Sequence, residues 1–223
     1  MELDRIYNED CFEGMKRIPD ETIDAVIADP PYCVGMSSNS TKSSTFDLSI
    51  IKPFYRELYR ELARVLKPDG WCYVFTDWRT YPIMYDAANS HLNQRNLIVW
   101  NKRNPTAGSW YLYSHELIVF CVKGTAGYRK FTHNHFDMIT VPKLPTNNRW
   151  HTAQKPEALI SQLILDSTSE GETILDPFMC TGTMAVCCRE LKRHYIGFEI
   201  DPANYEKGQK RLELDDQNVR LGF

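Results

Sequence analysis

Short β-rich runs alternate with helical stretches along this chain, and this alternation is the feature that most constrains its fold. Runs rich in β-branched, aromatic and other apolar residues lie at Asp24–Ala28, Trp71–Thr76 and Tyr195–Ile200. Between the first two, apolar residues recur at every fourth position from Ile50 to Leu66, as in an amphipathic helix that stops at residues 67–70. The alternation predicts an α/β sheet with crossover helices.

Further segments of the same two kinds complete the pattern. Pro156 fits the first turn of a helix, because a proline there gives up no hydrogen bond. The additional strands are predicted at residues 5–8, 97–100, 116–122 and 173–175, and the additional helices at 156–168, at 183–191 and after Asp201-Pro202.

Size and composition indicate one globular domain spanning residues 1–223. Hydrophobic residues make up 43% of the chain and charged residues 25%, which excludes a disordered tail protein and a collagen-like or coiled-coil rod. A chain of this length buries a core without disulfides or metals. The longest apolar runs, such as Leu117–Cys121, are too short to span a bilayer, so no membrane partner is expected.

Cysteine usage indicates a reducing compartment. The seven cysteines are odd in number, scattered and without a C-x-x-C pair, and no export signal opens the sequence. We therefore expect reduced thiols and a cytoplasmic location. His133 and His135 are two residues apart, a spacing common in loops, and no metal site is predicted.

Two segments interrupt the α/β alternation. Residues 33–45 are rich in Ser, Thr and Asn and predict a mobile loop. Residues 124–150 are irregular and carry four basic side chains against one acidic one, a net charge of +3, whereas the remainder of the chain carries −6. A long irregular insertion in a compact domain is usually functional or disordered. The concentrated positive charge favours a nucleic-acid contact there, although the overall charge is −3.

The tetrad Asp29-Pro30-Pro31-Tyr32 directly follows a buried strand and therefore lies at the carboxyl edge of the sheet, where open α/β folds bind ligands. The two prolines fix the backbone and leave their carbonyls as rigid acceptors. A carboxylate, a fixed carbonyl and an aromatic face can together bind a planar group that carries an amine. The alternative is a tight turn with a capping Asp and a packed Tyr.

A second junction, at residues 174–183, has the sequence Ile-Leu-Asp-Pro-Phe-Met-Cys-Thr-Gly-Thr. It predicts a strand, a turn of small residues and a helix start, where backbone N–H groups favour an anionic ligand. Glu199 follows Gly182 by 17 residues, near the spacing at which dinucleotide folds place a ribose-binding carboxylate. The full glycine fingerprint is absent, so an ordinary turn with a surface Glu is the alternative.

A third motif, His151-Thr-Ala-Gln-Lys155-Pro156, directly precedes a predicted helix. Lys155 could neutralise a carboxylate close to the start of that helix. A solvated lysine is the alternative.

Together these motifs resemble those of the amino-group DNA methyltransferases that use S-adenosylmethionine. Residues 29–32 resemble their catalytic tetrad, residues 176–183 their Asp-Pro-Phe-x-Gly-x-Gly-Thr cofactor motif, and residues 151–156 their His-x-x-Gln-Lys-Pro element. Residues 8–11 are similar to the Gly-Asp-Cys segment before the catalytic strand, and residues 197–199 to the ribose-binding strand.

The order of these motifs, catalytic first and cofactor last, is the permuted order of the β class, and the resemblance covers nearly the whole chain. It implies a Rossmann-like methyltransferase fold with a mostly parallel, seven-stranded sheet and helices on both faces. It also implies double-stranded DNA as the partner and residues 124–150 as the target-recognition region. Because members of this class often pair, a homodimer is expected; the sequence does not indicate whether a restriction partner exists.

The resemblance also assigns roles to individual residues. Glu199 is implied to hold the ribose hydroxyls, Asp10 and Cys11 to flank the adenine ring, and Asp176 and Lys155 to lie near the amino and carboxylate groups. The implied catalytic residues are Asp29, Pro30, Pro31 and Tyr32. The implied cofactor-binding residues are Asp10, Cys11, Lys155, Asp176, Phe178, Thr181, Gly182, Thr183 and Glu199. The implied DNA contacts are Arg129, Lys130, Lys143, Asn147, Asn148 and Arg149.

The implied activity is methyl transfer to the exocyclic N6 of adenine after base flipping. Asp29 opens the tetrad as in adenine enzymes of the family, whereas Ser is typical of cytosine-N4 enzymes. Three alternatives stay open: a cytosine-N4 methyltransferase, a catalytically silent DNA-binding subunit of the same fold, and an RNA or protein amine methyltransferase.

Cys180 departs from the family pattern, which usually has Gly at its position. Gly is favoured where φ is positive or where a ligand approaches the backbone closely. If either condition holds, the Cβ and sulfur of Cys180 crowd the cofactor, and lower cofactor affinity is expected.

Overall fold

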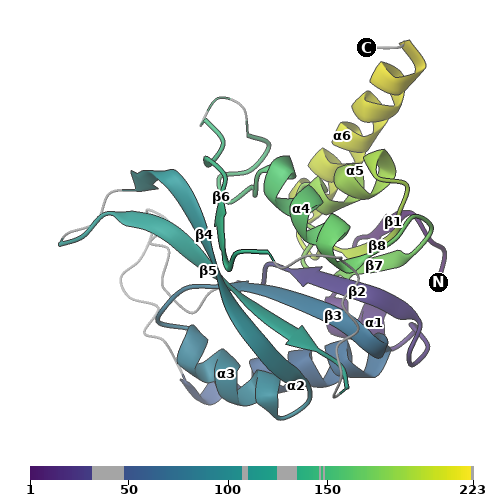
Figure 1. Ribbon diagram of the computed structural model, residues 1–223. Coiled ribbons are helices and arrows are strands. Elements are labelled where there is room, and N and C mark those ends of the chain that lie inside the picture. Colours follow the sequence, from purple (N-terminus) through teal and green to yellow (C-terminus); the bar gives the residue numbers. More distant parts are fainter. Residues whose placement is uncertain (32–47, 107–109, 125–134, 146, 148, 222–223) are drawn as a thin grey trace.

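A single eight-stranded sheet forms the centre of the computed structural model, which describes residues 1–31, 48–106, 110–124, 135–145, 147 and 149–221 (Figure 1). The strands lie in the order β1-β8-β7-β2-β3-β5-β4-β6. Their bounds are β1 Arg5–Tyr7, β2 Ile23–Ala28, β3 Leu66–Thr76, β4 Asn93–Thr106, β5 Tyr113–Val122, β6 Met138–Thr140, β7 Thr173–Asp176 and β8 His194–Phe198.

The sheet is mostly parallel, as predicted. From β1 through β8, β7 and β2 to β3, each strand runs parallel to its neighbour, and β5 is antiparallel to both β3 and β4. The strand count differs from the predicted seven, because β6 pairs with β4 at the sheet edge. This extra strand belongs to the 124–150 insertion, so part of the predicted recognition segment is built onto the sheet.

Helices cover both faces of the sheet, as the α/β pattern predicts (Figure 1). One face carries α1, α2 and α3, and the other carries α4, α5 and α6. In the described part of the chain, none of these helices combines the length and apolarity needed to cross a membrane. The bounds are α1 Cys11–Met15, α2 Leu48–Val65, α3 Tyr81–Asn89, α4 Glu157–Ser167, α5 Thr183–Glu190 and α6 Pro202–Leu221.

Strand β2 shows how the sequence builds the two-sided core. All six of its residues are buried. Successive strand side chains point to opposite faces, so Val26 and Ala28 pack into the cluster with α1–α3, whereas Ala25 and Ile27 pack into the cluster with α4–α6. Asp24 is tolerated in this strand because its carboxylate accepts hydrogen bonds from the Lys67 ammonium and a backbone N–H.

The boundary between α2 and β3 differs from the prediction. Residues 67–70 are predicted to separate the helix from the strand, but β3 already begins at Leu66. Ile23 of β2 pairs with Leu66, and Ala25 pairs with Trp71. Residues 67–70 therefore form an irregularity within the strand pairing. Strands accommodate extra residues as bulges without losing the flanking register.

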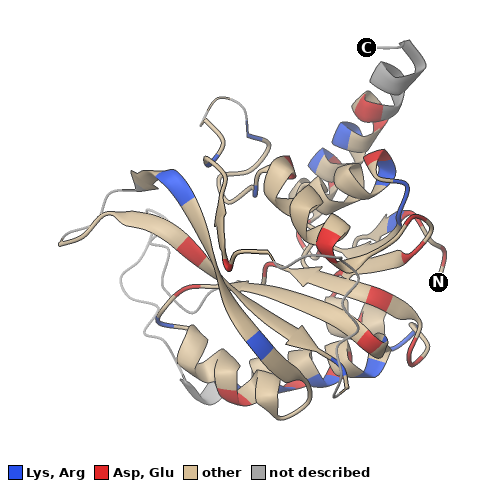
Figure 2. Ribbon diagram, viewed as in Figure 1, with Lys and Arg blue, Asp and Glu red and all other residues tan. Residues whose placement is uncertain are grey.

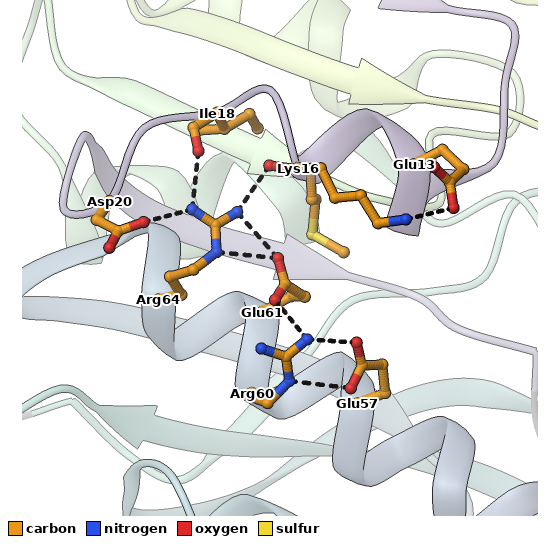
Figure 3. Close-up of polar contacts among 9 residues, drawn as sticks. Glu13, Lys16, Ile18, Asp20, Glu57, Arg60, Glu61 and Arg64 are labelled. Atoms are coloured by element: carbon orange, nitrogen blue, oxygen red, sulfur yellow. Dashed lines mark hydrogen bonds and ion pairs between the residues drawn. The ribbon is translucent and has the colours of Figure 1, made fainter.

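An ion-pair network ties the end of α2 to the segment before β2 (Figure 3). The Arg64 guanidinium donates to the Ile18 carbonyl and pairs with Asp20 and Glu61 at 2.6 and 2.9 Å. Glu61 is only 5% exposed and also pairs with Arg60 at 2.9 Å. This network lies where β2 begins, at the opposite edge of the sheet from the strand ends that carry the predicted motifs.

Two predicted segments fall wholly or partly outside the described residues. The predicted loop at 33–45 lies outside them entirely. The 124–150 insertion is described only at 124, 135–145, 147 and 149–150.

Candidate active site

The carboxyl ends of four parallel strands, β1, β8, β7 and β2, meet at one edge of the sheet. Each of the last three is followed or ended by an acidic residue: Glu199 after β8, Asp176 at the end of β7 and Asp29 after β2. A cavity of about 450 Å³ opens at this edge. Its walls include Asp10, Cys11, Phe12, Asp29, Pro31, Phe54, Phe75, His151, Gln154, Lys155, Asp176, Phe178, Cys180, Thr181, Thr183, Glu199 and Asn204.

The turn between β7 and α5 forms one wall. The Asp176 carboxylate accepts the Phe178 N–H at 2.9 Å, and this bond shapes the start of the turn. Cys180 has a φ of 49°, so the left-handed backbone that favours glycine is present at the very position where the family usually has Gly. Gly182 has a φ of 77° and is the N-cap of α5.

Glu199 is tied to the turn that it faces. One of its carboxylate oxygens accepts the Cys180 N–H at 2.8 Å, and the other accepts the Asp201 N–H at 2.8 Å. The side chain therefore connects the end of β8 to the β7–α5 turn and is held rigidly at the cavity wall. A carboxylate oxygen with one backbone partner keeps a second lone pair with which it can accept a ligand hydroxyl.

Asp10 begins helix α1 on the neighbouring wall. Its Oδ1 accepts the N–H groups of Phe12 and Glu13 at 2.9 and 3.2 Å, which is an N-cap. This cap explains why a helix of five residues forms directly after β1. It also fixes the orientation of the Asp10 carboxylate toward the cavity.

Asp29 belongs to a chain of ion pairs whose two lysines are buried and whose two carboxylates are partly buried. Its Oδ2 lies 2.5 Å from the Lys155 ammonium, which also lies 3.4 Å from Glu116 Oε2. Glu116 Oε1 in turn lies 3.2 Å from the Lys102 ammonium. The next residues of the tetrad are fixed as well, because the Tyr55 hydroxyl donates to the Pro31 carbonyl at 3.1 Å.

Negative charge accumulates around the cavity. Burial, together with the neighbouring charges of Asp29 and Glu199, raises the pKa of Asp176 to about 8, although its bond from the Phe178 N–H acts in the opposite direction. A cationic ligand at this place would favour the ionised form of Asp176 and offset its repulsion with Asp29 and Glu199.

Most predicted cofactor residues line this one cavity. Eight of the nine do so, and the exception is Gly182. A Cβ at Gly182 would lie 3.5 and 3.6 Å from Ile6 and Gly208. This glycine therefore packs against β1 and α6, and it affects the cavity only through the path of the turn. Pro30 is buried, whereas Tyr32 lies outside the described residues.

Lys155 lies in the cavity wall as predicted, but its ammonium is bonded to protein carboxylates. The resemblance implies a place near the amino and carboxylate groups of the cofactor. In the structure this ammonium pairs with Asp29 and Glu116. This pairing explains how a lysine that is 8% exposed keeps its charge.

The predicted DNA contacts are only partly described. Asn147 is exposed and Lys143 is half-buried, whereas Arg129, Lys130 and Asn148 lie outside the described residues. The Arg149 guanidinium donates to the backbone carbonyls of Leu144 and, at 2.9 Å, Thr152. In this arrangement Arg149 holds its own loop in shape.

Sequence reasoning missed Lys102 and Glu116, which complete the ion-pair chain behind Asp29. The local signal is weak, because Lys102 lies between the polar residues Asn101 and Arg103, and Glu116 lies just before the apolar run that begins at Leu117. Their partners come from segments distant in sequence, so no local pattern identifies the pairing.

Comparison with known proteins agrees with the geometry. Residues 23–210 match the sequence model of the N6/N4 DNA methylase family. The type II methyltransferase M.HinfI of Haemophilus influenzae is 29% identical over 247 residues, which cover 94% of this chain and 68% of that protein.

Solved structures show the same fold. The complex of M1.HpyAVI with S-adenosylmethionine has a TM-score of 0.74 and 24% identity and covers 93% of this chain and 98% of its own. The cytosine-N4-specific PvuII DNA methyltransferase has a TM-score of 0.72 and 16% identity, covering 96% of this chain and 92% of its own. With the family match spanning most of the sequence and the family's motifs gathered around one cavity, the chain belongs to the N6/N4 DNA methylase family.

Proposed function

We propose that this protein transfers a methyl group from S-adenosylmethionine to the exocyclic N6 of an adenine that is flipped out of double-stranded DNA. One observation carries the proposal: the Asp29 carboxylate lies on the wall of the same cavity that gathers the predicted cofactor residues. An acceptor for a base amine and a site for a methyl donor thus adjoin each other. The choice of adenine rests on Asp, and not Ser, at the first position of the tetrad.

The cavity fits S-adenosylmethionine in size and charge. When bound, this cofactor supplies an electrophilic methyl group on a positively charged sulfur. Asp29, Asp176 and Glu199 surround the cavity with carboxylates, which favour a ligand that carries a sulfonium and an ammonium group. Glu199 would hold the ribose hydroxyls, and Asp10 and Cys11 would flank the adenine ring.

The β7–α5 turn would hold the methionine part of the cofactor. Phe178, Thr181 and Thr183 line this side of the cavity, and Asp176 lies beside them. Gly182 contributes by its left-handed backbone, which sets the path of the turn into α5. The solved complex of M1.HpyAVI with S-adenosylmethionine, which has the same fold, supports this choice of cofactor.

Asp29 and the Pro30 carbonyl would activate the amine. The nitrogen lone pair of adenine N6 is delocalised into the ring, which makes the amine a poor nucleophile. Two acceptors for its N–H bonds would draw the nitrogen toward tetrahedral geometry and aim its lone pair at the methyl carbon. Such orientation and fixed dipoles supply roughly several kcal/mol each. A strong base is not needed, because the nitrogen becomes acidic as the new bond forms.

Base flipping would bring the amine to this site. The exocyclic nitrogen is shielded inside a duplex, and extrusion costs about a few kcal/mol. Stacking of the flipped base on an aromatic ring such as Tyr32 would recover about 1–3 kcal/mol. The basic side chains of the 124–150 insertion would neutralise backbone phosphates.

A methylation assay tests the proposal. Purified protein is incubated with S-adenosylmethionine and unmethylated plasmid, and the digested nucleosides are read by mass spectrometry beside an Asp29→Ala variant. We expect N6-methyladenine from the wild type alone. N4-methylcytosine as the product would change the proposed target base to cytosine and leave the proposed mechanism unchanged. No product, with cofactor binding intact in calorimetry, would support a silent module or a non-DNA substrate.

A further inference from the structure

We propose that Glu116 and Lys102 are positioning residues that hold Lys155 against Asp29 and thereby fix the carboxylate that receives the base amine. This inference rests on the proposed function, because it assigns Asp29 its role in methyl transfer. It goes further by naming two strand residues that line up behind Asp29 and act on it through Lys155.

The four side chains form an alternating row of charges. Asp29 Oδ2 lies 2.5 Å from the Lys155 ammonium, Glu116 lies 3.4 Å from that ammonium on its other side, and Lys102 ends the row 3.2 Å from Glu116. Side-chain exposure is 28% at Asp29, 9% at Lys155, 21% at Glu116 and 10% at Lys102. The row thus runs from the cavity wall into the protein.

The row joins four segments that are far apart in sequence. Lys102 comes from β4, Glu116 from the neighbouring β5, Lys155 from the segment before α4, and Asp29 from the end of β2. The Lys155 ammonium also lies 5.0 Å from the centre of the buried Phe75 ring. The ring shields one side of the ammonium from water, so its attraction to the two carboxylates is stronger than at a fully exposed surface.

Each inner charge depends on a neighbour on both sides. Burial alone lowers the pKa of Lys155, but the charges of Asp29 and Glu116 outweigh it, and the pKa ends above its usual value. Burial likewise opposes ionisation of Glu116, and Lys155 and Lys102 together bring its pKa below the usual value. Loss of the Glu116 charge would leave Lys155 with a single close carboxylate in this row and would change the position of the Lys155–Asp29 pair.

The first test is Glu116→Gln, which removes the charge and keeps the shape. Misplacement of a reacting group by about 1 Å can cost about 100-fold in rate, so a smaller shift of Asp29 should cost about 10–100-fold. We expect kcat for DNA methylation to fall by about that factor, with the Kd for S-adenosylmethionine, measured by calorimetry, changed less than about twofold. The matched control is Glu61→Gln, which likewise removes the charge of a carboxylate that lies between two cations (Figure 3) and should leave kcat unchanged.

The second test asks whether Lys102 acts through Glu116. Lys102→Met should lower kcat, and the double variant Lys102→Met/Glu116→Gln should be no slower than Glu116→Gln alone. Additive losses, an unchanged kcat in Glu116→Gln, or a loss confined to cofactor affinity would each overturn the inference.

A third readout needs no catalysis and so separates this inference from the proposed function. The pKa of Lys155 is followed by NMR titration of its Cε carbon. The ammonium faces Asp29 and Glu116 directly, with Asp176 farther across the cavity and Lys102 behind Glu116. Glu116→Gln should lower that pKa, and an unchanged pKa would overturn the inference. A wild type that fails to methylate DNA would instead refute the proposed function.

Discussion

The carboxyl group of Asp176 is buried at the end of β7, with the charges of Asp29 and Glu199 nearby. Its pKa of about 8 lies far above the value of about 3.8 that an unfolded chain gives it. The folded protein therefore holds a proton that the unfolded chain releases. The contribution of this group to stability is complete below pH 3.8 and is lost progressively as the pH rises to about 8.

Replacement of Asp176 by Asn should stabilise the protein at alkaline pH. Asn keeps an acceptor for the Phe178 N–H and removes the titrating proton. We expect the difference in unfolding free energy, variant minus wild type, to rise by roughly 4 kcal/mol between pH 5 and pH 8.5, because about three pH units below a pKa of about 8 each contribute about 1.4 kcal/mol. Urea titrations of both proteins at the two pH values measure it. A difference that does not change with pH would show that Asp176 titrates normally.

At Cys180 the backbone conformation and the side chain conflict. A φ of 49° places a non-glycine residue in the left-handed region, which costs about 1–2 kcal/mol. Cys180→Gly should relieve this strain, and after the greater entropy of the unfolded glycine the net gain should be about 0.5–1 kcal/mol in unfolding free energy.

Cys180→Ala is the control for that substitution, because it removes the sulfur and keeps the Cβ. Cys180 lines the cavity, so calorimetry with S-adenosylmethionine distinguishes the two sources of crowding. Tighter binding in the Gly variant alone would implicate the backbone and Cβ, whereas tighter binding in both would implicate the sulfur. No gain in stability from glycine would contradict the strain argument.

At the scale of elements, α6 holds the β7–α5 turn in place through one buried arginine. The Arg211 guanidinium donates to the Thr181 carbonyl at 3.2 Å and the Thr183 hydroxyl at 2.9 Å, and it pairs with Glu157 at the start of α4. One side chain thus joins α6, α4 and the β7–α5 turn. Because Arg211 is 6% exposed, few other groups can replace these bonds.

Arg211→Met should loosen that turn. The lost bonds should cost about 1–3 kcal/mol in unfolding free energy, and the affinity for S-adenosylmethionine should fall as the turn becomes mobile. The control is Arg189→Met, since Arg189 also links α5 to α6, through the Leu212 carbonyl, and lies in the last turn of α5, at the end opposite the β7–α5 turn. Equal loss of affinity in both variants would assign the effect to general destabilisation.

Sequence patterns predict elements well where the signal is local. The four-residue repeat from Ile50 to Leu66 predicts α2, because a helix that buries one side has apolar residues at that spacing. The apolar run before Asp29 predicts β2, because a strand that is buried on both faces is apolar throughout. Strand β6 has three residues and exists through its pairing with β4, which is a long-range contact with no local trace. Helix α1 has five residues, which is too short to show a periodic apolar pattern, and its only local signal is the Asp10 cap.

The candidate site follows the same division. The motifs around Asp29, Asp176 and Glu199 are contiguous stretches, so their place at the carboxyl edge follows from strand order and direction. The pairing of Lys155 with Glu116 cannot be predicted in this way, because Glu116 comes close to Lys155 only when β5 pairs with strands that are distant in sequence. Motifs locate a site in the sequence, whereas the contacts behind the motif residues depend on tertiary packing.

At the scale of the whole molecule, charge distribution limits how DNA can bind. The chain carries a net charge of −3, and Lys and Arg lie interspersed with Asp and Glu over both sides of the sheet (Figure 2). A duplex therefore meets no uniformly basic surface in the described residues. The 124–150 insertion concentrates +3, and β6 attaches its later part to β4, the strand that carries Lys102.

DNA affinity should consequently depend on salt through a few contacts in that insertion. Each phosphate contact contributes about 0.9 to the slope of log affinity against log salt concentration, so four basic residues predict a slope near −4 at most. The double variant Arg129→Ala/Lys130→Ala should reduce its magnitude by about 2, as fluorescence anisotropy with a labelled duplex measures. Arg5→Ala/Lys192→Ala removes two exposed cations at the opposite edge of the sheet and should leave the slope unchanged. Equal slopes for all three proteins would place the duplex on another face, because only cations that displace counterions from DNA affect this slope.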